Sequence, residues 1–485
     1  MKRSYILFLV LIGLFVSCTD SFEDFNTDKK NPAEVTGNAL FANSEKAMAD
    51  QVYSTNVNLN IFKMMAQYWT ETTYTDEANY LIDERNIPRN IYNAFYREAI
   101  KDMTEAATLI AIDPDPNATP VTIKNRLAII DILKAYCYQQ LVDTFGDIPD
   151  SEAMNIGNVY PKYDDAATIY SDMLTKINDA LSKLDESEGS FGSSDLIYGG
   201  DISAWEKFGN ALKIKIGISL ADVNPTLAKS TIESAVSGAF ASSADDAVFQ
   251  YLSASPNQNP LYTDLVASGR HDFVAANTIV DVMNNLDDPR RAFYFTTVDG
   301  EYVGGPYGVD NAYPNYSHIN DAIQAADYPA YLLTYDEMLF YLSEAAARGI
   351  SVPKTAEQYY NEGIIESITH WGGTAQMAND YLAQADVAWA TAPDASADGW
   401  REKIGTQSWI ASYVRGLVGY TTWRRLDYPV FNVAPTIETT QDIPTRFTYP
   451  IEEQTLNADN YKSASSAIGG DELTTKLFWD MHPAN

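Results

Sequence analysis

Apolar residues recur at intervals of three and four along most of this chain of 485 residues. That spacing places them on one face of an α-helix, whereas a half-buried strand would alternate apolar and polar residues. The pattern predicts helices over 39–54, 60–72, 91–112, 121–144, 164–185, 203–221, 226–237, 276–286, 332–348, 355–370 and 402–417. Asp201 and Thr355 stand where capping residues are expected, directly ahead of two of these segments. We therefore expect an all-α dominated fold with little β-structure.

The expected helices follow one another as pairs joined by short turns. Some carry an aromatic residue near the start and small residues where two helices can approach closely, as tetratricopeptide helices do. Examples are Trp205, Phe208, Ala211 and Gly217. No strict repeat of roughly 34 residues is present, so any repeats are degenerate. We predict a tetratricopeptide-like scaffold of helical pairs, with Trp205, Trp409 and Trp423 in its core.

Long segments without helical periodicity separate some of these pairs. They cover 239–275, 290–330, 373–401 and 428–485 and are rich in Tyr, Asn, Asp, Gly and Pro. Loops of this length in a compact protein are usually functional. No low-complexity linker divides the chain, so we expect one globular domain over 39–485 with elaborated loops.

The N-terminus has the pattern of a signal peptide, which we assign to residues 1–17. Lys2 and Arg3 precede an apolar run of about twelve residues, which is shorter than the roughly 20 that a membrane-spanning helix needs. A small residue and then Cys18 follow the run, as in a lipoprotein, and we predict that Cys18 carries the lipid. Phe15 stands where a strict lipoprotein signal prefers Leu, and the alternative is an unlipidated signal. Residues 18–38 are polar and acidic and are expected to form a lipidated tether.

The formal net charge is −33, and no run of Lys and Arg forms a basic patch. Such a surface repels nucleic acid and anionic lipid, so we expect no nucleic-acid partner.

The chain has two cysteines. If Cys18 carries lipid, Cys137 has no disulfide partner, and its place on an apolar helical stripe indicates a buried packing role.

Common catalytic motifs are absent from the sequence, including G-x-S-x-G, H-E-x-x-H, the P-loop and C-x-x-C. The four histidines are scattered, which disfavours a histidine metal cluster or a catalytic triad: His271, His318, His370 and His482. A calcium loop at 113–124 is disfavoured because Lys124 stands where the bidentate Glu is needed. We therefore expect no cofactor and no catalysis, although a structural calcium ion is conceivable. A glycosidase needs only two carboxylates, and 66 acidic residues leave that alternative open.

Aromatic residues are abundant, with 32 Tyr and 8 Trp, and many of the tyrosines lie in the loops. The C–H face of a sugar ring stacks on an aromatic ring while its hydroxyls bond to polar side chains, so loop tyrosines beside amides suit glycan binding. Two segments, 74–80 and 302–318, carry the candidates Tyr74, Tyr80, Tyr302, Tyr307, Asn311, Tyr313, Asn315 and Tyr316. The alternative is that these side chains pack the loops onto the scaffold.

Several segments, in order along the chain, resemble SusD/RagB-family lipoproteins. FEDFNTDKKNP follows Cys18, and LVDTFGDIP at 141–149 is similar to a helix end of that family. WRRLDYP at 423–429 and IPTRFTYPIEEQTLNADNY at 443–461 are similar to its C-terminal signature. The matches extend from Cys18 to about Trp479, and we expect them to be elements of the scaffold.

The resemblance implies a helical, tetratricopeptide-like lipoprotein on the cell-surface side of the outer membrane. It implies a SusC-like TonB-dependent transporter as partner, to which the protein delivers a captured nutrient, an oligosaccharide or in some members a peptide. In glycan-binding members an early loop and a mid-chain loop form the binding platform, and 74–80 and 302–318 agree with these loops in region. Two alternatives stay open: a surface glycoside hydrolase, and a peptide-binding or protein-interaction scaffold.

Overall fold

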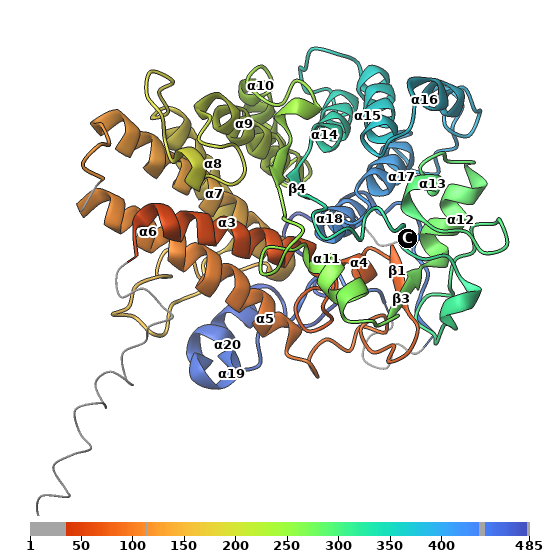
Figure 1. Ribbon diagram of the computed structural model, residues 1–485, viewed down its shortest axis with the longest axis horizontal. Helices are drawn as coiled ribbons and strands as arrows, with labels where there is room; N and C mark the ends of the chain where they lie inside the picture. Colours follow the sequence, from red (N-terminus) through yellow and green to blue (C-terminus); the bar gives the residue numbers. More distant parts are fainter. Residues whose placement is uncertain (1–34, 113–114, 436–441, 483–485) are drawn as a thin grey trace, which may run out of the picture.

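The computed structural model describes residues 35–112, 115–435 and 442–482, and helices dominate it, as predicted (Figure 1). The predicted signal peptide and Cys18 lie outside the described residues. The longer helices are α3 (Gly37–Tyr53), α6 (Lys101–Ile112), α7 (Pro120–Phe145), α8 (Ala166–Leu181), α9 (Ile202–Ser219), α10 (Pro225–Ala235), α12 (Asn277–Asn285), α14 (Tyr335–Ala347), α15 (Ala356–His370), α17 (Arg401–Ala411) and α18 (Gly416–Leu426). Among the described residues, no helix is both long and apolar enough to cross a membrane.

Shorter helices and four short strands make up the rest of the regular structure. The short helices are α4 (Phe62–Met65), α5 (Ile87–Asn93), α11 (Pro260–Tyr262), α13 (Arg291–Tyr294), α16 (Ala375–Leu382), α19 (Glu453–Leu456), α20 (Ala458–Ala467), the 3₁₀ turns η2 (Gly192–Ser194), η3 (Ser243–Asp245) and η5 (Tyr313–Asn315), and the π-helices η1 (Ala94–Ile100) and η4 (Thr263–Ala267). Strand β1 (Trp69–Glu71) pairs antiparallel with β3 (Phe273–Ala275), and β2 (Ala247–Phe249) pairs antiparallel with β4 (Ala330–Leu333).

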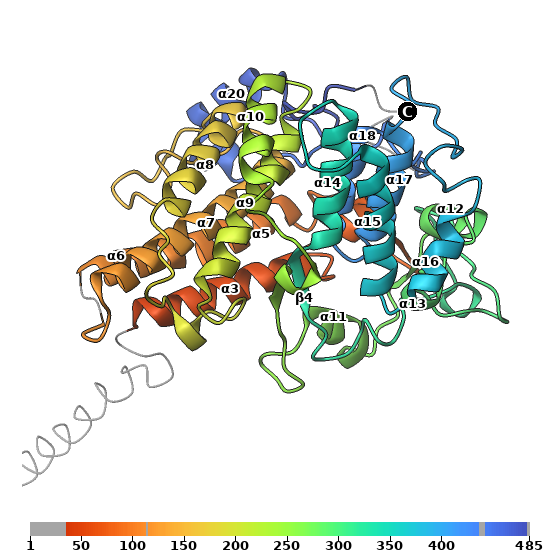
Figure 2. The ribbon, with the colours of Figure 1, turned by 90° about the horizontal axis from the view of Figure 1, so that it is seen from above.

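The long helices pack as pairs. α3 packs against α6, α7 against α8, α9 against α10, α14 against α15 and α17 against α18. α8 also contacts α9, and α9 contacts α14, so that neighbouring pairs join in one continuous layer (Figure 2). This arrangement confirms the predicted scaffold of tetratricopeptide-like helical pairs.

Capping residues begin these helices as predicted. The Asp201 carboxylate accepts a hydrogen bond from the backbone N–H of Ala204 (3.2 Å). The Thr355 hydroxyl accepts from the Gln358 backbone N–H, and the Gln358 side chain accepts from the Thr355 N–H. Such a reciprocal box satisfies two helix N–H groups that would otherwise have no partner.

The centre of the core is α7. Ile129, Leu133, Cys137 and Leu141 follow one another at intervals of four residues along it, and all four are fully buried. Burial raises the pKa of the Cys137 thiol, which therefore stays protonated and packs as a small apolar side chain, as predicted. Trp205, Trp409 and Trp423 are also buried, which confirms their predicted place in the core.

Residues far along the chain complete the C-terminal end of α7. The Arg424 guanidinium donates to the Asp143 carbonyl oxygen (2.6 Å), and the Phe447 N–H donates to the Thr144 carbonyl oxygen (2.9 Å). The Trp479 indole N–H donates to the Asp143 carboxylate (3.2 Å). The last carbonyls of a helix have no partner inside it. The segments that resemble family motifs, at 141–149, 423–429 and 443–461, therefore meet at this end of α7.

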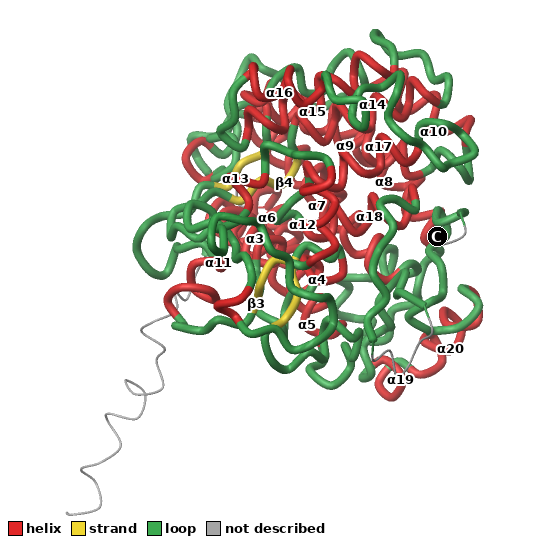
Figure 3. The backbone as a smooth tube through the Cα atoms, turned by 90° about the vertical axis from the view of Figure 1, so that its right-hand side faces the viewer, coloured by secondary structure: helices red, strands yellow, loops and turns green. Residues whose placement is uncertain are grey.

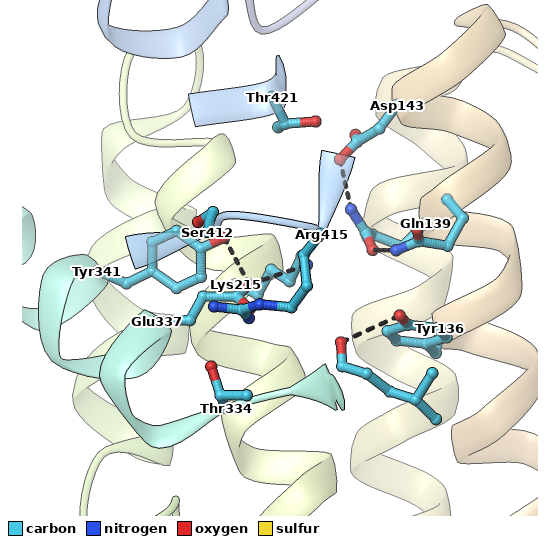
Figure 4. Close-up of polar contacts among 12 residues, drawn as sticks. Tyr136, Gln139, Asp143, Lys215, Thr334, Glu337, Tyr341, Ser412, Arg415 and Thr421 are labelled. Atoms are coloured by element: carbon cyan, nitrogen blue, oxygen red, sulfur yellow. Dashed lines mark hydrogen bonds and ion pairs between the residues drawn. The ribbon is translucent and has the colours of Figure 1, made fainter. Parts of the chain in front are cut away.

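A buried polar network links α9, α14 and the segment between α17 and α18 (Figure 4). The Glu337 carboxylate accepts from Lys215 Nζ (3.0 Å), from the Tyr341 hydroxyl (2.8 Å) and from the Arg415 guanidinium. These four side chains are all buried. Buried charges are tolerated when they are paired and hydrogen-bonded, so the network fixes how the three elements sit against one another.

The structure corrects two of the predicted helices. Only Phe62–Met65 is helical within 60–72, because Gln67 takes a positive φ of 53° and the chain then enters β1. The predicted helix 402–417 is interrupted: α17 ends at Ala411, the chain turns at Val414, whose φ is 65°, and α18 begins at Gly416. Positive φ is sterically costly for a residue with a Cβ atom and ends a right-handed helix.

Short helices also occur inside segments predicted to be irregular. α16 lies within 373–401, and α19 and α20 lie within 428–485. The other described residues of these segments, and most of 239–275 and 290–330, are loop (Figure 3).

Candidate functional site

Three loops meet beside the β1–β3 pair, which Figure 3 shows surrounded by loops. The backbone N–H of Thr72 donates to the Asp272 carbonyl oxygen (2.9 Å), and the N–H of Asn311 donates to the Thr72 carbonyl oxygen (3.1 Å). The N–H of Ala275 donates to the Ser317 carbonyl oxygen (2.9 Å). The predicted binding segments 74–80 and 302–318 therefore lie next to each other, with 270–275 between them.

Tyr313 lies within a stack of three rings. Its centroid is 3.6 Å from that of His318 at an interplanar angle of 6°, and 4.2 Å from that of His271 at 28°. If both imidazoles lay this close to the same face of Tyr313, their atoms would overlap. The two imidazoles therefore cover opposite faces of Tyr313. His271 is exposed and forms the outer end of the stack. The His318 ring is fixed through Nε2, which lies 2.7 Å from the Tyr313 carbonyl oxygen.

Tyr74 is the most exposed of the predicted residues, with 72% of its surface accessible. It has a φ of 58° and follows the Thr72 contact by two residues. Close by, Arg270 donates to the Asp272 carboxylate (2.5 Å). This hydrogen bond and the charge of Asp272 raise the pKa of Arg270.

The 3₁₀ turn η5 carries two more of the predicted residues to the surface. Asn315 is exposed and Tyr316 is partly exposed. Neither side chain makes a hydrogen bond within the described part of the chain. We define the loop platform as the exposed surface formed by Tyr74, Arg270, His271, Tyr313, Asn315 and Tyr316.

Three predicted residues are buried and hold the loops in place. Tyr80 and Tyr307 are 1% and 4% exposed, and the Tyr307 hydroxyl donates to the Met64 carbonyl oxygen (2.9 Å). Asn311, which is 1% exposed, donates to the carbonyl oxygens of Glu71, Pro306 and Val309. In this conformation their side chains are inaccessible to a ligand.

Tyr302 is half-buried at a different place. The Arg291 guanidinium lies over its ring, 5.5 Å from the centroid, and its carbonyl oxygen accepts from the Asn284 side chain. It thus packs against the region of α12 and α13, and it shows no contact with the three-ring stack.

A pair of buried carboxyl groups lies beneath the 74–80 loop. Burial, with a smaller contribution from the neighbouring Glu77, raises the pKa of Glu71 to about 10. Glu77 forms an ion pair with Arg85. The pair therefore shares one proton, held on Glu71, and Glu71 also accepts from the Ala78 N–H (3.0 Å). Glu71 and Glu77 are 2% and 0% exposed, so this pair is closed to a substrate and supports the loop.

Sequence reasoning missed His271, Arg270 and His318. The histidines were set aside because they are scattered in the sequence. Only the pairing of β1 with β3 and the return of the 302–318 loop bring these residues together. Within the described residues, no group of three His, Cys, Asp or Glu side chains is placed to hold a metal ion.

The loop platform offers the groups that recognise sugars. The outer face of His271 and the ring of Tyr74 can stack on the C–H face of a sugar ring. Arg270, Asp272 and Asn315 supply donors and acceptors for hydroxyls. A few well-placed polar groups beside flat apolar surfaces are typical of small-molecule sites.

Comparisons with known proteins point to one family. The family model SusD-like_2, described as starch-binding and associating with the outer membrane, matches residues 29–450. A solved chitin-binding protein is 24% identical with a TM-score of 0.79, over 92% of this chain and 100% of that one. A SusD homologue from Bacteroides uniformis is 25% identical with a TM-score of 0.78, over 92% and 99%. A chitin-binding SusD homologue from Flavobacterium johnsoniae is 23% identical with a TM-score of 0.78, over 92% and 98%. Curated proteins give no significant match.

Proposed function

Because the chain belongs to the SusD-like family of starch-binding proteins that associate with the outer membrane, we propose that it binds an oligosaccharide at the loop platform. The observation that carries the proposal is the exposed ring of His271, which stacks on Tyr313. The exposed ring of Tyr74 is on the adjoining loop, since Thr72, two residues earlier, donates to the His271 carbonyl oxygen. Large aromatic side chains are normally buried, and exposed rings on converging loops suit a stacking ligand.

The proposed ligand is a neutral oligosaccharide derived from starch or chitin. The family description names starch, and two structural relatives are described as chitin-binding. The ring of His271 already packs on Tyr313, so it loses little conformational freedom when a ligand binds, which favours affinity. Each stacked ring is expected to contribute about 1 kcal/mol.

We propose that the protein works as a carrier without catalysis. Cys18 would carry lipid and residues 18–38 would tether the globular part, 39–485, to the cell-surface face of the outer membrane. The bound oligosaccharide would pass to a SusC-like TonB-dependent transporter. The Asp272 carboxylate beside the platform is already paired with Arg270, whereas hydrolysis of a glycosidic bond uses two carboxyl groups flanking that bond.

Calorimetry with starch- and chitin-derived oligosaccharides tests the proposal. We expect binding without product formation, and a loss of roughly 25-fold in affinity in a Tyr74→Ala/His271→Ala variant, about fivefold for each ring. The matched control is Tyr160→Ala, since Tyr160 is 59% exposed in the separate loop 151–162.

Three results would contradict the proposal. Release of shorter sugars would favour a glycoside hydrolase, and binding of peptides alone would favour an interaction scaffold. Unchanged affinity in the double variant would remove the loop platform as the site.

A further inference from the structure

A second concave surface lies away from the loop platform, and we call it the amide-lined cleft. It has a volume of about 840 Å³ and lies between the C-terminal half of α3, the π-helix η1 and residues 256–264. α11 contacts α3 here, and Figure 1 shows α11 beside the end of α3. The amide side chains that line the cleft are Asn43, Gln51, Asn56, Asn90, Asn93, Asn257 and Gln258.

Both π-helices of the described chain border this cleft. η1 contributes Arg97 and Glu98, and η4 contributes Thr263 and Asp264. π-Helical turns are rare, and they occur frequently at functional sites. The presence of two such turns, from distant parts of the sequence, therefore indicates that the cleft is a functional site.

Several amide groups in the cleft have unused hydrogen-bonding capacity. The side chains of Asn93 and Asn257 make no hydrogen bond within the described residues. Asn43 donates to Asp102 (2.8 Å) and Gln258 donates to the Ser253 carbonyl oxygen (3.0 Å), so the amide oxygens of both are left for a ligand. An amide offers two donors and an acceptor, which match the hydroxyls of a sugar.

Four of the five charged side chains in the cleft form ion pairs. Lys46 donates to Asp50 (2.5 Å), and Arg97 lies 2.9 Å from Glu98. Asp264 accepts from the Thr55 hydroxyl and N–H (3.3 Å each). Paired charges leave no strong field for an ionic ligand, so the lining favours a neutral, hydroxyl-rich one.

The cleft and the loop platform are joined by a short stretch of chain. η4 lines the cleft, and the chain continues from it to Arg270 and His271 on the platform. Because seven residues separate Asp264 from His271, their Cα atoms lie at most about 25 Å apart. One extended oligosaccharide can therefore reach both.

We propose that the amide-lined cleft is a second binding site for neutral oligosaccharide, which holds the part of a long ligand that extends beyond the loop platform. The inference rests on the proposed function and deepens it, since it makes the protein selective for chain length. Short oligosaccharides use the platform alone. Long ones use the platform and the cleft.

Affinity measured against chain length tests this inference. The probes are maltohexaose and chitohexaose, compared with maltose and chitobiose. An Asn93→Ala/Asn257→Ala variant is expected to bind the hexasaccharide roughly tenfold more weakly, because two neutral hydrogen bonds are lost, and the disaccharide unchanged. The matched control is Asn178→Ala, an exposed asparagine on α8. Equal hexasaccharide affinity in the variant and the wild type would overturn the inference.

Hydrogen exchange of the wild-type protein separates this inference from the proposed function. With the hexasaccharide we expect protection of both 93–100 and 257–267, together with 270–273 and 311–318. Protection of the platform segments alone would overturn the cleft but keep the platform. Protection of neither region by any of the four sugars would overturn both.

Discussion

The ring of Tyr313 lies parallel to the imidazole of His318, with centroids 3.6 Å apart and planes inclined by 6°. Since His271 covers the opposite face, the ring of Tyr313 is a support, and the stacking surface for a ligand is the outer face of His271. The sequence predicts Tyr313 as a ligand-binding residue. The structure indicates that the ring available to a ligand is that of His271, which lies outside Tyr313.

Replacing His271 by Ala is therefore expected to weaken oligosaccharide binding roughly fivefold, because one stacking ring is lost. His271→Tyr should retain binding, since it restores a flat ring at the same place. Isothermal calorimetry on both variants checks this. Equal affinity of the Ala variant and the wild type would show that His271 does not contact the ligand.

Tyr307→Phe is expected to lower the free energy of unfolding by about 1–2 kcal/mol, because the Met64 carbonyl oxygen loses its buried donor. Oligosaccharide affinity should change little, since Tyr307 is covered by the loops. Urea unfolding measures the first quantity. Tyr316→Phe is the control, and a similar loss of stability in that partly exposed residue would argue against the assigned role of Tyr307.

Glu337→Gln should destabilise the protein by about 3 kcal/mol, because it leaves Lys215 buried without a countercharge and Arg415 with only the more distant Asp336 carboxylate (3.5 Å). Glu105→Gln, at an exposed position of α6, should change stability by less than about 0.5 kcal/mol. Chemical unfolding of both variants is the measurement. Equal effects would mean that the buried network does not fix the helices.

Glu71→Gln tests the carboxyl pair through its pH dependence. The folded pKa is raised to about 10, whereas a glutamate in the unfolded chain titrates near 4.3. The folded state thus keeps a proton that the unfolded state releases, so this stabilising contribution is complete below about pH 4.3 and is lost as pH rises toward 10. The amide does not titrate.

The stability of Glu71→Gln relative to the wild type is therefore expected to increase between about pH 5 and pH 9. Thermal unfolding at a series of pH values provides the measurement. A constant difference across that range would mean that Glu71 is already ionised at neutral pH in the folded protein.

The lipid anchor is tested separately, because Cys18 lies outside the described residues. Cys18→Ala is expected to move the protein from the outer-membrane fraction to a soluble fraction, since an anchor depends on the burial of its acyl chains. Fractionation of cells that express each form would show it. Retention of the variant in the membrane would point to attachment through another part of the molecule.

The scaffold was predictable because its signals are local. The apolar stripe of α7 and the caps at Asp201 and Thr355 can be read from a few consecutive residues. α18 was missed because Gly416 and Gly419 weaken helix propensity. A Cβ atom at Gly416 would lie 2.4 Å from the Phe62 carbonyl carbon, and one at Gly419 would lie 2.0 Å from the Tyr68 hydroxyl. Close packing therefore requires these glycines.

The site was predictable only as a region. Tyr74 and Tyr80 lie six residues apart, yet one is 72% exposed and the other 1%. Both have positive φ, and the direction of the Tyr80 side chain depends on its ring contact with Tyr307, more than 200 positions away. No local pattern contains that information.

The way α7 ends has a consequence for the order in which the molecule can form. Its last carbonyls and the Asp143 carboxylate accept hydrogen bonds from Arg424, Phe447 and Trp479, which come much later in the sequence. A growing chain synthesises α7 early but cannot close the core around it until residue 479 has been made. A product truncated before Trp479 would leave the end of α7 without these donors, and we expect proteases to cleave it more readily than the full chain.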